Sequence, residues 1–155
     1  MLPDKGMLFP LGTNEAAALA EIDKLKPFLQ GKVVGVQSAS IAATFLEKYL
    51  KGVVEVREYK TTEQHDLDLA SGRVDLIMAS MAYLTTAASR AGNEEMAITG
   101  PRFQGGILGK GSAIGLRKTD VELKAKLDYA IRDAVADGTI KRLSEKYFGY
   151  DVTPR

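Results

Sequence analysis

The sequence contains no cysteine and a single histidine, His65. Without cysteine there can be no disulfide, no thiolate metal site and no thiol nucleophile. His65 lies between Gln64 and Asp66 in a predicted helix, without a second histidine to complete a zinc ligand set. We therefore expect no metal or other cofactor, and we expect His65 on a solvated helix face.

The sequence also lacks an excess of charge of either sign. Lysine and arginine total 21 against 20 aspartates and glutamates, which gives a formal net charge of +1. Because the two signs are interspersed, the composition does not favour a nucleic-acid or membrane-surface partner. No apolar run approaches the roughly 18 residues of a membrane span. Residues 1–6 do not show the basic and then apolar pattern of a secretory signal, so the sequence as given is expected to be soluble, without an export signal.

The 155 residues, of which 45% are hydrophobic, suffice for one core. Residues up to Thr13 are predicted to form an irregular arm. Apolar residues then recur at helical spacing, which predicts a helix that ends at Gly31. Three strand and helix units come next, with strands at 32–36, 53–59 and 74–78. This alternation predicts an α/β fold with a mainly parallel sheet.

Two more short strands are predicted at 97–99 and 114–117, which makes a five-stranded sheet. The glycine-rich run 105–111 separates them. It does not fit a phosphate loop, because Gln104 stands at the position of the first glycine and Gly111 follows Lys110. We expect a hinge-side loop there instead. Two amphipathic helices, separated by Asp137 and Gly138, close the chain as a helical hairpin.

The segment 35–41 joins the first strand of these units to its helix. It places serine hydroxyls and unpaired backbone amides at a helix N-terminus, which suits a carboxylate. The alternative is that Ser40 only caps the helix. Ser80 follows the third strand, and ligands of open parallel sheets bind at the carboxyl ends of strands. For Ser80 too, a capping role stays open.

No catalytic site is predicted. A nucleophile needs a base within hydrogen-bond reach, and neither His65 nor the surface-spaced carboxylates form such a constellation. We therefore expect a binding protein and not an enzyme.

Several segments taken together resemble the type II periplasmic solute-binding proteins of ABC importers. They occur in the order and at the spacing of that family, and the likeness extends over nearly the whole chain from Gly31. The segments are 35–37, 71–75, 100–101, 115–118 and 137–149.

The resemblance implies two α/β lobes that close over an amino acid, and it implies a periplasmic location and a membrane permease as partner. Residues 1–30 would form an arm and a helix, 31–112 one complete ligand-binding lobe, and 113–155 the return crossover and the last helices of an incomplete second lobe. The family's aromatic stacking residues and part of its carboxylate clamp would lie in the missing part. The last helices then have an apolar face without its usual partner, so we expect a homodimer or exchanged helices.

Departures from the family pattern indicate the ligand. Relatives that bind lysine or arginine have an aspartate at the position of Ser80, and Ile41 replaces a common threonine. With the run 100–106, this resembles the octopine- and nopaline-binding branch, whose ligands carry a secondary amine and an additional carboxylate. We expect an opine or an arginine-like ligand, with Ser80 facing its amine. The candidate ligand-binding residues are Gln37, Ser38, Ala39, Ser40, Ile41 and Ser80.

Three alternatives stay open. A truncated lobe could act only by self-association and bind no ligand. The chain could resemble the cyclohexadienyl dehydratases, which share the two-lobed fold, although most catalytic groups would lie in the missing lobe. A regulatory effector domain would need DNA-binding helices, which this sequence lacks.

Overall fold

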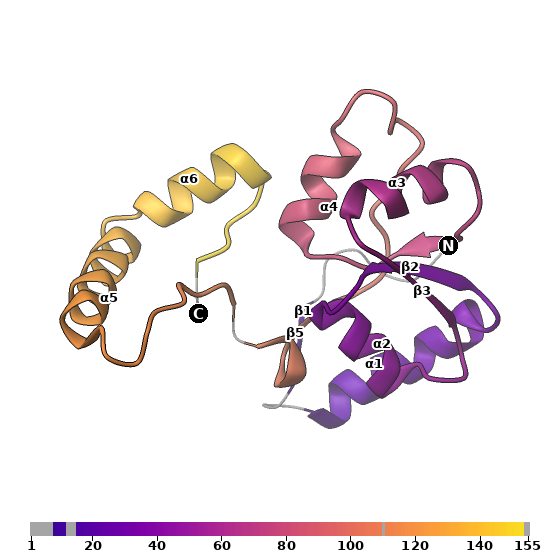
Figure 1. Cartoon of the computed structure of the whole chain (residues 1–155), viewed down its shortest axis with the longest axis horizontal. Helices are drawn as coiled ribbons and strands as arrows, with labels where there is room; N and C mark the ends of the chain where they lie inside the picture. Colours follow the sequence, from indigo (N-terminus) through magenta and orange to yellow (C-terminus); the bar gives the residue numbers. More distant parts are fainter. Residues whose placement is uncertain (1–7, 12–14, 110, 154–155) are drawn as a thin grey trace. The chain divides into compact units, whose positions relative to one another are not determined.

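A computed structural model describes residues 8–11, 15–109 and 111–153 (Figure 1). The chain divides into two compact units, Met1–Lys110 and Gly111–Arg155. Of the predicted arm, residues 1–7 and 12–14 lie outside the described part.

The first unit is built from strands and helices that alternate along the chain, so the predicted α/β class is confirmed. Its helices are α1 (Glu15–Leu29), α2 (Ile41–Tyr49), α3 (Thr62–Ala70) and α4 (Met81–Ala88). Its strands are β1 (Leu8–Leu11), β2 (Val33–Gln37), β3 (Glu55–Tyr59), β4 (Leu76–Ile77) and β5 (Arg102–Gly105), and a 3₁₀ turn follows at Gly106–Leu108.

Three of the strands form a parallel sheet in the order β3-β2-β4. Val33 pairs with Glu55 and Gln37 with Tyr59, while Gly35 of β2 pairs with Ile77 of β4. Because all three strands run in the same direction, their carboxyl ends lie at one edge of the sheet. The segments that follow β2, β3 and β4 therefore start from a common edge.

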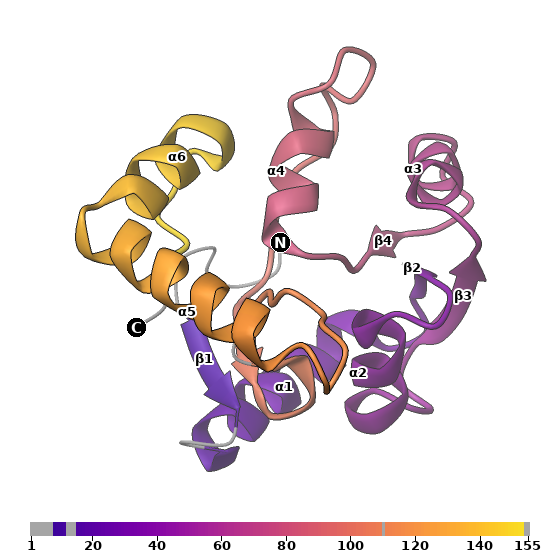
Figure 2. The same cartoon turned by 60° about the vertical axis from the view of Figure 1, so that its left-hand side comes forward.

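The hydrophobic core lies on one face of this sheet. Val34 and Val36 of β2 are buried there with residues of α1 and α2, including Ile22 and Phe45. Because successive side chains of a strand point to opposite faces, Gly35 faces the other side, where α3 packs. Figures 1 and 2 show α1 and α2 on one side of β2 and α3 on the other.

The prediction of a single five-stranded sheet is wrong. The described residues contain five strands in two sheets, and β1 and β5 form a separate parallel pair in which Leu8 is opposite Arg102. The arm is therefore not irregular at Leu8–Leu11, because its backbone finds a partner in β5. A propensity pattern along one segment does not reveal this pairing partner.

The strands predicted after residue 90 also differ from those observed. Residues 97–99 and 114–117 form no strand, and β5 instead covers Arg102–Gly105. The beginning of the predicted glycine loop is thus a strand end followed by a 3₁₀ turn. Gly105, Gly106 and Gly109 adopt positive φ angles there, which explains the need for glycine.

The second unit contains two helices, α5 (Val121–Ala136) and α6 (Thr139–Phe148). Among its described residues only Ser144 is buried, and its hydroxyl donates to the Lys141 carbonyl while accepting from the Val152 amide. Many large apolar side chains are exposed, with Tyr129 at 67%. Within the described residues, no helix has the length and apolar character needed to cross a membrane.

Candidate functional site

The common edge of the β3-β2-β4 sheet carries the predicted ligand segment. β2 ends at Gln37, and the backbone amide of Ser38 donates to the Tyr59 carbonyl at 2.8 Å, which continues the ladder by one residue. The Gln37 side chain reaches toward the Lys60 carbonyl, with its amide nitrogen at 3.5 Å. The backbone of Met78 donates to the Gly35 carbonyl at 3.0 Å and leads on to Ser80. The structure thus brings residues 37–41 and Ser80 to one edge.

The turn between β2 and α2 contains an unusual backbone conformation. Ala39 has a φ angle of +55°, and it is the one non-glycine residue with positive φ among those described. L-residues with a β-carbon are disfavoured in this left-handed region. Strained backbone is often found in binding and catalytic sites, so the outlier makes this turn a candidate for function.

Ser40 is the N-cap of α2. Its backbone is extended, and its hydroxyl oxygen accepts from the Ala43 amide at 3.2 Å. The capping role considered for Ser40 is therefore confirmed, and its contact with a ligand stays a prediction. The side chain of Ile41, the first residue of α2, is 55% exposed.

Ser80 is the N-cap of α4. Its hydroxyl oxygen accepts from the Tyr83 amide at 3.3 Å, and its carbonyl accepts from the Leu84 amide at 2.9 Å. Two serine-capped helices therefore begin at the edge where β2 and β4 end. Each helix leaves backbone amides of its first turn without intrahelical acceptors, and its dipole favours negative charge at that end.

The chemistry available at the starts of α2 and α4 is anion binding by neutral donors. The Ser38 amide is already bound to Tyr59, so only the Ser38 hydroxyl is left to donate to a ligand. Ser38, Ala39 and Ser80 are exposed. Two hollows of about 470 and 500 Å³ are not lined by these three residues: one lies beside Tyr59, Asp68 and Arg73, the other in the second unit.

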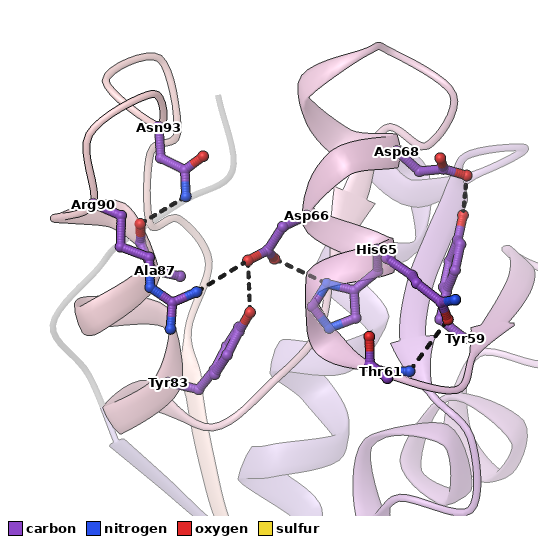
Figure 3. Close-up of polar contacts among 10 residues, drawn as sticks. Tyr59, Thr61, His65, Asp66, Asp68, Tyr83, Ala87, Arg90 and Asn93 are labelled. Atoms are coloured by element: carbon purple, nitrogen blue, oxygen red, sulfur yellow. Dashed lines mark hydrogen bonds and ion pairs between the residues drawn. The ribbon is translucent and has the colours of Figure 1, made fainter.

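The prediction that His65 lies on a solvated face is wrong. His65 is 0% exposed, between the rings of Tyr59 and Tyr83 at centroid distances of 6.1 and 5.9 Å (Figure 3). Its Nδ1 lies 3.0 Å from Oδ1 of Asp66. Burial lowers the pKa of His65, because the charged form would lose its hydration, and nearby Asp66 opposes this shift. The imidazole is therefore neutral at pH 7.

Asp66 is the centre of a polar cluster that sequence reasoning missed. Its side chain is 10% exposed, and Oδ2 accepts from the Tyr83 hydroxyl at 2.6 Å and lies 3.9 Å from Nη1 of Arg90 (Figure 3). Burial raises the pKa of Tyr83, and the hydrogen bond to Asp66 adds to this. Tyr83 therefore stays a donor at neutral pH, and the cluster joins α3 to α4.

A second phenol and carboxylate pair joins α3 to β3. The Tyr59 hydroxyl donates to Oδ2 of Asp68 at 2.7 Å, and Nε of Arg73 donates to Oδ1 of the same carboxylate at 2.7 Å. These hydrogen bonds lower the pKa of Asp68, and the hydrogen bond with Arg73 has the larger effect. The described residues contain no group of three or more metal-ligating side chains.

Comparison with known proteins places this chain in a family. The family model of bacterial extracellular solute-binding proteins, family 3, matches residues 28–150. The octopine-binding periplasmic protein of Rhizobium meliloti is 40% identical, over 99% of this chain and 58% of the relative. The L-arginine-binding protein of Pseudomonas aeruginosa is 32% identical, over 86% of this chain and 52% of the relative.

A solved structure, an ancestral arginine-binding protein bound to arginine, superimposes with a TM-score of 0.61. It is 27% identical, and the alignment covers 80% of this chain and 54% of that one. The chain thus spans between half and three-fifths of the length of these relatives.

Proposed function

The chain belongs to the bacterial extracellular solute-binding proteins, family 3, and from that premise we propose that it captures an amino acid or an opine for an ABC importer. It would do so as one wall of a two-lobed site, and it would carry no enzymatic activity. A periplasmic location and a membrane permease as partner belong to the same proposal, since the similar octopine-binding protein is named periplasmic.

The observation that carries the proposal is the pair of serine-capped helix N-termini at one sheet edge. Ser40 is the N-cap of α2 and Ser80 is the N-cap of α4, and the two residues follow the neighbouring strands β2 and β4. A ligand carboxylate at the α2 terminus would meet free amides, the favourable end of the dipole and the Ser38 hydroxyl. Gln37, Ala39 and Ile41 complete this wall of the site.

The ligand class follows from the absence of a carboxylate at the start of α4. Ser80 offers a hydroxyl and no negative charge, so a primary ammonium would gain no ion pair from it. A secondary amine that carries a further carboxylate, as in octopine, has less need of such a pair. The similarity to an octopine-binding protein supports this choice, and arginine is the second candidate because similar proteins bind it.

A second candidate function is self-association without ligand. It is favoured by the second unit, where Val121, Tyr129 and Tyr147 are between 66% and 69% exposed. Apolar side chains in such numbers favour association with another surface. A homodimer or an exchange of helices between two copies would cover them. The dehydratase alternative has no comparable support, since the starts of α2 and α4 offer serine hydroxyls and backbone amides and no candidate base.

A charge substitution at the cap tests the site without loss of the fold. Asparagine and aspartate both cap helices as well as serine does, so Ser40→Asn and Ser40→Asp should be as stable as the original protein. Aspartate adds a negative charge where the ligand carboxylate would bind. In calorimetric titrations with octopine, we expect Ser40→Asp to bind at least about tenfold more weakly than Ser40→Asn. Equal affinities of the two variants would show that the carboxylate binds elsewhere.

A further inference from the structure

The helix that presents Ser80 is not part of the main hydrophobic core. The buried cluster is made of residues from α1, β2 and α2 and of Leu50, and the partly buried apolar residues packed against it include none from α4. Among the described residues of α4, only Ala87 is buried. Apolar packing alone therefore fixes α4 weakly, and its position depends on polar contacts.

These polar contacts converge on Asp66 of α3. The Tyr83 hydroxyl donates to Oδ2 at 2.6 Å, and the Arg90 guanidinium, just beyond the end of α4, lies 3.9 Å from the same oxygen. The guanidinium also lies over the Tyr83 ring, with its carbon 5.8 Å from the centroid. A hydrogen bond to a buried carboxylate is stronger than one between neutral groups. Figure 3 shows the three side chains meeting between the two helices.

Tyr83 connects this contact to the candidate site. Its backbone amide donates to the Ser80 hydroxyl at 3.3 Å, while its phenol donates to Asp66. Tyr83 therefore contacts the Ser80 hydroxyl through its backbone amide and the Asp66 carboxylate of the neighbouring helix through its phenol. On the other side of the carboxylate, Oδ1 of Asp66 lies 3.0 Å from Nδ1 of His65, which is packed between two tyrosine rings.

We propose that Asp66 and Tyr83 are positioning residues, which hold α4 so that Ser80 faces the ligand amine at the sheet edge. The role of Ser80 rests on the proposed function, whereas the anchoring of α4 does not. Through Ser80, this contact would set the preference between primary and secondary amines without either residue touching the ligand.

The chain offers a matched control for the test. Tyr83→Phe and Tyr59→Phe each remove one phenol hydroxyl that donates to an aspartate of α3, at 2.6 and 2.7 Å respectively. The Tyr59 pair joins α3 to β3 and does not involve α4. Both variants should therefore lose similar stability, while only Tyr83→Phe acts on the helix that presents Ser80.

Hydrogen exchange followed by mass spectrometry on the full chain measures the anchoring directly. We expect amides of residues 81–89 to exchange roughly tenfold faster in Tyr83→Phe and to be unchanged in Tyr59→Phe. Unchanged exchange in Tyr83→Phe, or the same increase in both variants, would overturn the proposal.

The second readout is the ratio of the dissociation constants for arginine and octopine, which a general loss of stability would not change. We expect a severalfold change of this ratio in Tyr83→Phe and none in Tyr59→Phe; an unchanged ratio would refute the link to Ser80. If the original protein binds neither ligand, the proposed function fails, while faster exchange confined to α4 would still support the anchoring.

Discussion

His65 occupies the space that a side chain at position 35 would need. A β-carbon built on Gly35 would lie 3.2 Å from the β-carbon of His65 and 3.3 Å from Cε2 of Tyr59. Gly35 is the central residue of β2, and His65 belongs to the helix that packs above it. The absence of a side chain at position 35 thus lets α3 approach the sheet closely.

The substitution Gly35→Ala tests this close approach. The His65 β-carbon is fixed to the helix backbone and cannot turn aside, so α3 would have to move. We expect a loss of about 1–3 kcal/mol in the free energy of unfolding, measured by urea denaturation. Gly115→Ala is the control, because a β-carbon there would meet no atom within 4 Å. Its effect should be within about 0.5 kcal/mol, and similar losses in both variants would contradict the account.

Buried His65 predicts a loss of stability in weak acid. Burial lowers its pKa below the usual 6.5, so between these two values the unfolded chain takes up a proton that the folded chain does not. Stability is therefore complete above about pH 6.5 and falls as the pH drops toward the folded pKa, by at most about 1.4 kcal/mol per pH unit. His65→Gln should remove this slope between about pH 7 and pH 5.5, above the range in which the carboxylates take up protons. Because His65 is the only histidine, a slope that persists in this variant would refute the assignment.

The positive φ angle of Ala39 predicts a stabilising glycine substitution. Glycine adopts this conformation without the strain that a β-carbon causes. The relief of this strain outweighs the cost of the greater conformational freedom that glycine has in the unfolded chain. We expect Ala39→Gly to raise the free energy of unfolding by about 0.5–1 kcal/mol. The same change at Ala43, inside α2, should lower it by about 0.5–1 kcal/mol. Changes of the same sign at both positions would contradict the strained turn.

The exposed apolar residues of the second unit predict association. In multi-angle light scattering we expect the chain to elute as a dimer, because α5 and α6 leave large apolar side chains exposed. The substitutions Val121→Lys and Tyr129→Lys should shift the equilibrium toward the monomer, because these two residues are 69% and 67% exposed. A clean monomer of the unsubstituted chain at all concentrations would refute self-association.

The sequence predicted those features that depend on local pattern. Helical spacing located α1 from its buried positions Ile22 and Leu25, and the β-branched run located β2. Ser40 and Ser80 were both found at helix starts, because serine followed by helix-forming residues is a local signal.

Features that depend on distant partners were missed. β1 exists because β5 is its partner, and no pattern within residues 8–11 indicates that pairing. In α3 the buried residues are His65 and Asp66, while Leu67 is 67% exposed, which inverts the expected hydrophobic pattern. The tyrosines from β3 and α4 help to make burial of this polar pair favourable, and they lie six and seventeen residues from their partners in α3. The glycine in the middle of β2 was the one signal of a close approach.

Ligand capture is the central claim, and a thermal unfolding series tests it most directly. The unsubstituted chain would be heated with octopine, nopaline, arginine, lysine or glutamine at millimolar concentration. A ligand at about 100 times its dissociation constant should stabilise the fold by roughly 2.7 kcal/mol, which raises the midpoint by several degrees. We predict a selective rise with octopine or nopaline and a smaller one with arginine. An unchanged midpoint with all five compounds would contradict ligand capture and favour a chain that acts by self-association.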